Sequence, residues 1–222
     1  MCGICGIAHP DSGRRPDELL LDRMTQSLAH RGPDDGGTVI TPPVGLGHRR
    51  LSVVGVATGH QPMEDTERGL VLTYNGEIYN FPALRAELVA KGVAFRSGAD
   101  TEVLLRGYTH WGMEQLLQRI VGMFAFALWD GPQQRLYLVR DRLGVKPLYW
   151  TSDPDGSLYF ASEIRALRLV PAVQDTLDTT AALHYLSLGY VVGHKAIIDG
   201  VEQLEAGTCL TWEPGKSPKM AQ

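Results

Sequence analysis

Residues Met123–Ala161 read MFAFALWDGPQQRLYLVRDRLGVKPLYWTSDPDGSLYFA. This stretch contains short apolar runs that are typical of β-strands, separated by turn signals such as Asp130-Gly131 and Asp155-Gly156. The runs are Met123–Trp129, Leu136–Arg140, Pro147–Trp150 and Leu158–Ala161. Strands follow one another here and do not alternate regularly with helices. The sequence therefore predicts an α+β fold with largely antiparallel sheets, in preference to a doubly wound parallel sheet.

The rest of the chain adds further strands and several helices to this pattern. A helix over Pro16–Ala29 is predicted by its apolar spacing. Gly92 indicates the end of the helix that is predicted over Pro82–Lys91. Three more helices are predicted, over Thr101–Trp111, after Ser162 and over Thr179–Leu188. Further strands are predicted around Gly37–Ile40, Val44–Arg49 and Leu70–Tyr74. Pro and Gly crowd residues 213–222, which therefore resemble a linker.

Composition excludes several classes of function. The 222 residues carry a formal net charge of −4, which does not favour binding to nucleic acid or to an anionic membrane. The longest apolar run, Ile120–Trp129, is half the ~20 residues that a membrane-spanning helix needs. The N-terminus lacks the pattern of a secretory signal. We expect a cytoplasmic protein with no membrane and no nucleic-acid partner.

Cys2 is the first candidate for chemistry. Removal of Met1 would leave a thiol and a free α-amine on one residue, so that the amine could act as the base for the nucleophile. An alternative is that Cys2 is a small apolar residue in a buried strand. Cys2 and Cys5 also form a C-x-x-C pair, which leaves a metal or redox site open, although no second ligand pair follows.

Asn75 and Gly76 are candidates for stabilising a developing oxyanion. The asparagine offers a side-chain amide, and the glycine lets a backbone N–H approach a ligand closely. The same Asn-Gly pair between apolar residues is also the usual signature of a two-residue hairpin turn. We favour the turn, which is compatible with an amide directed at a ligand.

Arg50 and Asp100 could recognise an amino acid. An arginine can hold a carboxylate through two hydrogen bonds, and an aspartate can pair with an ammonium group. The simpler interpretations are a solvated strand charge for Arg50 and a helix N-cap for Asp100.

Several motifs occur in an order that resembles one family. They are MCGICGI at Met1–Ile7, HRGPD at His30–Asp34, RLS at Arg50–Ser52, NGEIYN at Asn75–Asn80, DTE at Asp100–Glu102, GMFAFA at Gly122–Ala127 and RDRLGVKPLY at Arg140–Tyr149. The chain closely resembles the glutaminase domain of glutamine-hydrolysing asparagine synthetases, a class II glutamine amidotransferase of the N-terminal nucleophile hydrolase superfamily. The resemblance implies an amidotransferase core over residues 1–170 and an extension of it over 171–212, leading toward a synthetase domain.

The resemblance also implies a fold and a set of roles. The fold would be a four-layer α/β/β/α sandwich of two antiparallel sheets. Cys2 would attack the side-chain amide of L-glutamine to form a thioester, and Asn75 and Gly76 would form the oxyanion hole. Arg50 would hold the α-carboxylate of the substrate. The α-ammonium would lie against Asp100, with Glu77 and backbone groups near Val53 and Val54.

Other implications concern partners and cofactors. By resemblance, this chain needs no metal and no cofactor, and ATP and magnesium would serve only a synthetase domain or subunit that accepts the ammonia. That acceptor would make asparagine, or amidate a different carboxylate in related enzymes, and a homodimer is also compatible. If Met1 is retained, the chain would instead be a non-catalytic glutamine-binding module. Cys5 would pack in the core, and Arg140–Lys146 would brace the fold or the passage to a partner domain.

Overall fold

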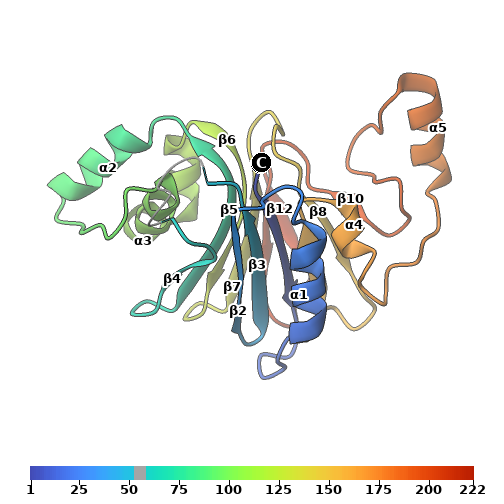
Figure 1. Ribbon diagram of the computed structural model, residues 1–222, viewed down its shortest axis with the longest axis horizontal. Coiled ribbons are helices and arrows are strands. Elements are labelled where there is room, and N and C mark those ends of the chain that lie inside the picture. The colour runs from blue at the N-terminus through green and yellow to red at the C-terminus, as the bar shows by residue number, and fades with distance from the viewer. Residues whose placement is uncertain (53–58) are drawn as a thin grey trace.

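The computed structural model describes residues 1–52 and 59–222. In this part of the chain the strands form two six-stranded antiparallel sheets (Figure 1). Sheet A consists of β1 (Gly3–Ala8), β2 (Asp35–Thr41), β3 (Val44–Arg50), β8 (Tyr149–Ser152), β9 (Leu158–Ala161) and β10 (Glu202–Gln203). Sheet B consists of β4 (Met63–Asp65), β5 (Leu70–Ile78), β6 (Gly122–Asp130), β7 (Arg135–Arg140), β11 (Cys209–Trp212) and β12 (Lys219–Ala221). The strand orders are β10-β8-β9-β1-β3-β2 and β12-β11-β7-β6-β5-β4.

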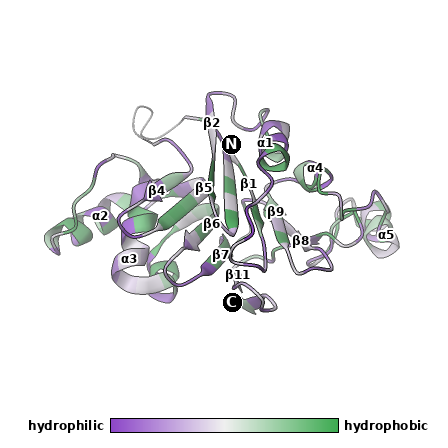
Figure 2. Cartoon of the chain, turned by 90° about the horizontal axis from the view of Figure 1, so that it is seen from below, coloured by the Kyte–Doolittle hydropathy of each residue, from purple (hydrophilic) through white to green (hydrophobic). Residues whose placement is uncertain are grey.

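Helices cover the outer face of each sheet. These helices are α1 (Glu18–Ser27), α2 (Phe81–Ala90), α3 (Asp100–Arg119) and α4 (Ile164–Leu167), whereas α5 (Thr179–Leu188) lies apart from both sheets. Helices α2 and α3 lie on the side of sheet B, whereas α1 and α4 lie on the side of sheet A, as the view from below also shows (Figure 2). The predicted four-layer α/β/β/α sandwich is therefore confirmed.

The main core lies between the two sheets. Alternate residues of a strand point to opposite faces, so each central strand contributes every second side chain to this layer. Ile4, Leu46, Trp129, Phe160 and Trp212 are all buried there. Full burial of such a side chain contributes about 1.5–3 kcal/mol, so this layer supplies much of the free energy that holds the two sheets together.

Most predicted elements are present, with shifted ends. The first helix begins after Asp17, whose carboxylate accepts a hydrogen bond from the backbone N–H of Leu20 at 3.0 Å. Helix α5 has the predicted bounds. The backbone of α3 breaks at Gly112, at φ 76°, so its first segment ends near the predicted end at Trp111 and a second segment continues to Arg119. In the linker-like tail, exposed residues of β12 pair with β11.

The predicted Asn75-Gly76 hairpin turn is wrong. Both residues lie inside β5, where Asn75 pairs with Ala125 and Gly76 with Phe124 of β6. A Cβ atom on Gly76 would lie 2.3 Å from the backbone oxygen of Met123. The glycine is therefore required by close backbone approach between neighbouring strands and not by a turn.

Residues 1–52 and 59–222 contain no helix that is both long and apolar enough to cross a membrane.

Candidate functional site

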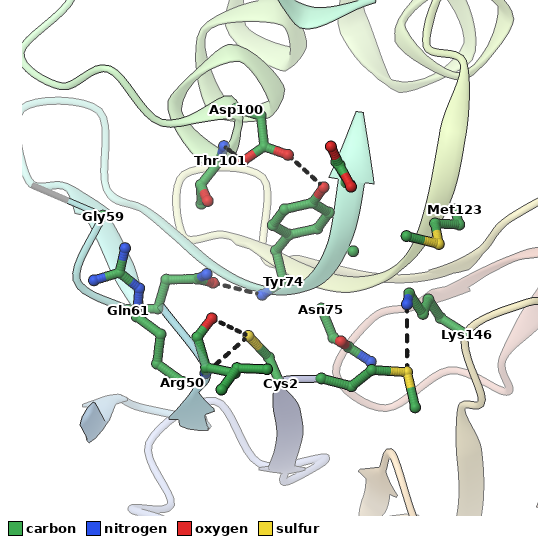
Figure 3. Close-up of a pocket in the computed structure, with 14 residues that line it drawn as sticks. Cys2, Arg50, Gly59, Gln61, Tyr74, Asn75, Asp100, Thr101, Met123 and Lys146 are labelled. Carbon is green, nitrogen blue, oxygen red and sulfur yellow. Dashed lines mark hydrogen bonds between the residues drawn. The ribbon is translucent and has the colours of Figure 1, made fainter. Parts of the chain in front are cut away.

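A cavity of about 170 Å³ opens where the end of β3, the start of β1 and the middle of β5 come together (Figure 3). It is smaller than the ~300–1,000 Å³ pockets that hold drug-sized ligands, which suits a ligand the size of an amino acid. The described residues that line it are Met1, Cys2, Arg50, Leu51, Gly59, Gln61, Tyr74, Asn75, Gly76, Glu77, Asp100, Thr101, Met123 and Lys146. The sequence-predicted residues Cys2, Arg50, Asn75, Gly76, Glu77 and Asp100 therefore meet at one place. Val53 and Val54, the remaining two, lie outside the described residues.

Cys2 is held at the edge of this cavity by its backbone and its sulfur. The Cys2 carbonyl accepts a hydrogen bond from Nε of Arg31 at 2.9 Å, and Arg31 in turn pairs with Glu163 at 2.9 Å. The backbone N–H of Leu51 lies 3.4 Å from the Cys2 sulfur. The Cys2 thiol in turn donates to the backbone oxygen of Leu51 at 3.7 Å. Sequence reasoning did not assign Arg31 this anchoring contact.

Cys5 lies on the other side of β1. Its sulfur is 3.3 Å from the hydroxyl oxygen of Thr25 on α1, and burial raises the pKa of the Cys5 thiol to about 12. Cys2 precedes β1 and lines the cavity, whereas Cys5 is fully buried within β1 against α1, so the two thiols face different surroundings. The described part of the chain also holds no group of three or more His, Cys, Asp or Glu side chains placed to bind a metal. The geometry assigns Cys5 to the core and does not support the C-x-x-C alternative.

Asn75 presents an unpaired donor. Its side chain is 1% exposed and lines the cavity, and its Nδ2 has no hydrogen-bond partner among the residues that the structure describes. A buried N–H group without a partner typically costs about 1–3 kcal/mol, so such groups need an explanation. A ligand oxygen in the cavity would supply the partner.

Arg50 ends β3 and points into the same space (Figure 3). It is 6% exposed, and its backbone carbonyl accepts a hydrogen bond from the N–H of Asp34 at 3.1 Å. A Cβ atom on Gly32 would lie 2.4 Å from the backbone nitrogen of Arg50. The Arg31-Gly32-Pro33-Asp34 motif therefore packs directly on the segment that carries the arginine, and a glycine is needed there for close approach.

Asp100 lies at the other end of the cavity, at the start of α3. Its Oδ2 accepts hydrogen bonds from the Tyr74 hydroxyl at 2.7 Å and from the backbone N–H of Ile78 at 3.0 Å. Burial, and then the Asp100 carboxylate, raise the pKa of Tyr74 well above its usual value, so the phenol remains a donor. The predicted N-cap role of Asp100 is wrong by one residue, because Ala99 is the N-cap and Asp100 begins the helix.

Three lining residues have contacts that sequence reasoning missed. Tyr74 holds Asp100, and the side-chain oxygen of Gln61 accepts a hydrogen bond from the Tyr74 backbone N–H at 2.7 Å. Nζ of Lys146 donates to the sulfur of Met1 at 3.4 Å. These contacts join residues far apart in the chain, so no local pattern identifies them. The cavity thus has cationic groups at Arg50 and Lys146 and anionic groups at Glu77 and Asp100.

The loop Arg140–Lys146 braces one wall of the cavity. Asp141 accepts hydrogen bonds from four backbone N–H groups, those of Phe124, Leu143, Val145 and Lys146. The Arg140 guanidinium donates to three backbone carbonyls, those of Gly144, Lys146 and Leu204. The charged side chains of Arg140 and Asp141 thus bind backbone groups of the loop and its neighbours, which is what a bracing role requires.

Comparison with known proteins identifies the family. The sequence profile of the glutamine amidotransferase domain matches residues 1–221. Asparagine synthetase [glutamine-hydrolyzing] 1 of Bacillus subtilis (strain 168) is 39% identical over 216 residues, which cover 96% of this chain and 34% of that protein. Asparagine synthetase B [glutamine-hydrolyzing] of Escherichia coli (strain K12) is 42% identical over 170 residues, 75% of this chain and 30% of that protein. The chain spans about a third of the length of the curated relatives it matches.

A solved structure is similar in fold. Glutamine phosphoribosylpyrophosphate amidotransferase of B. subtilis, complexed with ADP and GMP, superposes with a TM-score of 0.70 at 20% sequence identity. The match covers 100% of this chain and 49% of that chain. The family profile, the relatives and the fold all agree with the resemblance inferred from the sequence motifs. The chain belongs to the glutamine amidotransferase domain family.

Proposed function

We propose that this chain hydrolyses the side-chain amide of L-glutamine to give glutamate and ammonia, with Cys2 as the N-terminal nucleophile. The observation that carries the proposal is the convergence of a thiol, an unpaired amide donor, a cation and an anion on one cavity of about 170 Å³. Arg50 would bind the α-carboxylate, and Asp100 with Glu77 would bind the α-ammonium. This arrangement would direct the side-chain amide of glutamine toward Cys2 and Asn75.

The chemistry would proceed in two halves. The Cys2 thiol gives its proton to its own α-amine, and the sulfur attacks the amide carbon. The oxyanion accepts hydrogen bonds from Nδ2 of Asn75 and from the backbone N–H of Gly76. When the C–N bond breaks, the protonated amine passes its proton to the leaving nitrogen, and ammonia leaves a γ-glutamyl thioester. Water, activated by the same amine, then attacks the thioester, and glutamate and the thiol are released.

The proposal requires Met1 to be removed, because an acylated nitrogen on Cys2 cannot act as the base. We therefore expect a version of the chain with a protease-cleavable extension before Cys2 to release no glutamate from L-glutamine. Cleavage that exposes Cys2 should restore activity, and intact mass would verify each form. Equal activity before and after cleavage would rule out the α-amine as the base. Glutamine binding without hydrolysis in the cleaved form would instead favour the non-catalytic binding module.

Arg50→Ala is expected to raise the KM for glutamine by about 10- to 100-fold, because hydrogen bonds to charged groups contribute roughly 1.5–3 kcal/mol. The kcat should change much less, since the carboxylate lies away from the bond that breaks. Steady-state glutamate release measures both constants. Arg14→Ala is the control, because Arg14 is an exposed arginine that pairs with Asp155 on the surface. An unchanged KM in Arg50→Ala would remove Arg50 from the binding site.

We further propose that the ammonia passes to a synthetase domain or subunit that activates a carboxylate with ATP and magnesium, as the names of the relatives suggest for asparagine. The acceptor could also be another carboxylate. Asparagine formation from aspartate, glutamine and ATP would be expected only when such a domain or subunit accompanies this chain. We place this function in the cytoplasm, with a homodimer as a further expectation. No cofactor is proposed for this chain.

A further inference from the structure

His48 and Thr73 lie directly below the candidate site, one in each sheet. His48 precedes Arg50 by two residues on β3, and Thr73 precedes Asn75 by two residues on β5. Residues two apart in a strand share a face, so each member of this lower pair lies on the same face as a site residue. Both His48 and Thr73 are completely buried.

A hydrogen bond joins the two sheets at this level. Nδ1 of His48 lies 3.1 Å from the hydroxyl oxygen of Thr73, and that hydroxyl donates its proton to the backbone oxygen of Gly47 at 3.1 Å. Because the threonine has a single hydroxyl proton, its oxygen accepts from Nδ1–H of the histidine. Burial, and then the charge of Arg50, lower the pKa of His48 to about 3, so the ring remains neutral.

Burying a histidine in this layer between the sheets lowers the stability of the fold. Its Nε2 is buried and has no hydrogen-bond partner within residues 1–52 and 59–222. The neighbouring intersheet positions are apolar, including Ile4, which pairs with His48 across β1 and β3. An apolar side chain would avoid the unpaired nitrogen, which costs about 1–3 kcal/mol. Stability alone therefore does not account for the His48–Thr73 pair.

We propose that the His48–Thr73 hydrogen bond sets the spacing between Arg50 and Asn75, so that His48 and Thr73 are positioning residues for glutamine hydrolysis. The inference rests on the function proposed above. Glutamine would be held by Arg50 of sheet A at its α-carboxylate and by Asn75 of sheet B at its amide oxygen. Apolar contacts between sheets are non-directional, whereas a hydrogen bond prefers one distance and one angle. A misplacement of 1 Å can reduce the rate by about 10²-fold.

Thr73→Val removes the hydroxyl and keeps the shape of the side chain. We expect kcat/KM for glutamine to fall by about 10- to 100-fold, and Thr73→Ser to restore it to within about threefold of wild type. Thr151→Val is the matched control, because the buried Thr151 hydroxyl donates to the backbone oxygen of Gly200 at 2.7 Å, on β8 and away from the site. Wild-type kcat/KM in Thr73→Val, or an equal loss in Thr151→Val, would overturn the proposal.

A double-mutant cycle separates positioning from general loosening of the fold. In an Arg50→Ala background the spacing no longer matters, so we expect Thr73→Val to reduce kcat/KM by less than about threefold. A full additive loss would mean that Thr73 acts independently of Arg50 and would overturn the inference. Failure of the wild type to hydrolyse glutamine would overturn the proposed function and this inference together. Normal wild-type activity with normal Thr73→Val kinetics would overturn this inference alone.

Discussion

Cys2→Ala is expected to lower glutamate release from L-glutamine by at least ~10⁴-fold, because removal of a catalytic nucleophile leaves only the stabilisation that the rest of the site supplies. Glutamine should still bind, since Arg50 and Asp100 are unchanged and the thiol is not needed to hold the ground state. Calorimetry on processed Cys2→Ala would measure the binding, and a coupled glutamate assay would measure the rate. The variant should therefore separate binding from chemistry.

Cys5→Ala is the matched control for this experiment. Cys5 is the same residue type three positions along the chain, but it lies within β1 and its sulfur contacts Thr25 on the α1 side of sheet A. We expect activity close to wild type and a small loss of stability from the cavity left behind. If Cys2→Ala hydrolyses glutamine as fast as wild type, Cys2 is not the nucleophile. Loss of activity in Cys5→Ala alone would point to the other thiol.

Asn75→Ala should lower kcat by about 10²- to 10³-fold, the usual effect of deleting one oxyanion-hole donor. The KM should change little, because the donor meets its strongest partner only when the carbonyl oxygen becomes negatively charged. Steady-state kinetics on processed protein would give both constants. The unpaired Nδ2 of Asn75 is the structural reason for expecting this split.

Asn80 provides the comparison, as the chain's other asparagine. Its side chain donates to the backbone oxygen of Arg119 and accepts from the N–H of Val121, so it ties the end of α3 to the start of α2 and does not line the cavity. Asn80→Ala should reduce stability and leave kcat near the wild-type value. A kcat for Asn75→Ala that matches Asn80→Ala would contradict the oxyanion role.

Much of the architecture follows from local patterns. The strands around Met123–Ala161 and the helix over Thr179–Leu188 are predicted because apolar spacing and turn residues are short-range signals. The Asn75-Gly76 turn fails for the opposite reason. Its local signature is strong, but nine consecutive pairs between β5 and β6 keep the backbone extended. Long-range pairing overrides turn propensity at that position.

At the candidate site, too, local motifs identify residues, whereas long-range contacts are found only in the structure. Cys2, Arg50, Asn75 and Asp100 are identified from motifs, and the structure brings them to one cavity, while their roles remain proposals. The Tyr74–Asp100 hydrogen bond and the Arg31 contact to the Cys2 carbonyl could not be predicted from the sequence. Each depends on where a helix or strand packs in three dimensions, and single-chain periodicity contains no such information.

The place of Asn75 and Gly76 within β5 has a consequence for how the site responds to stress. A donor on a loop can loosen while the rest of the molecule stays folded. A donor in a strand that is paired along its whole length moves only when that ladder opens, and the central sheet is among the last parts of a protein to open. The hydrogen bonds between β5 and β6 thus hold the oxyanion donors in place and also stabilise the folded state. Heat should therefore inactivate the oxyanion site only as it unfolds the sheet.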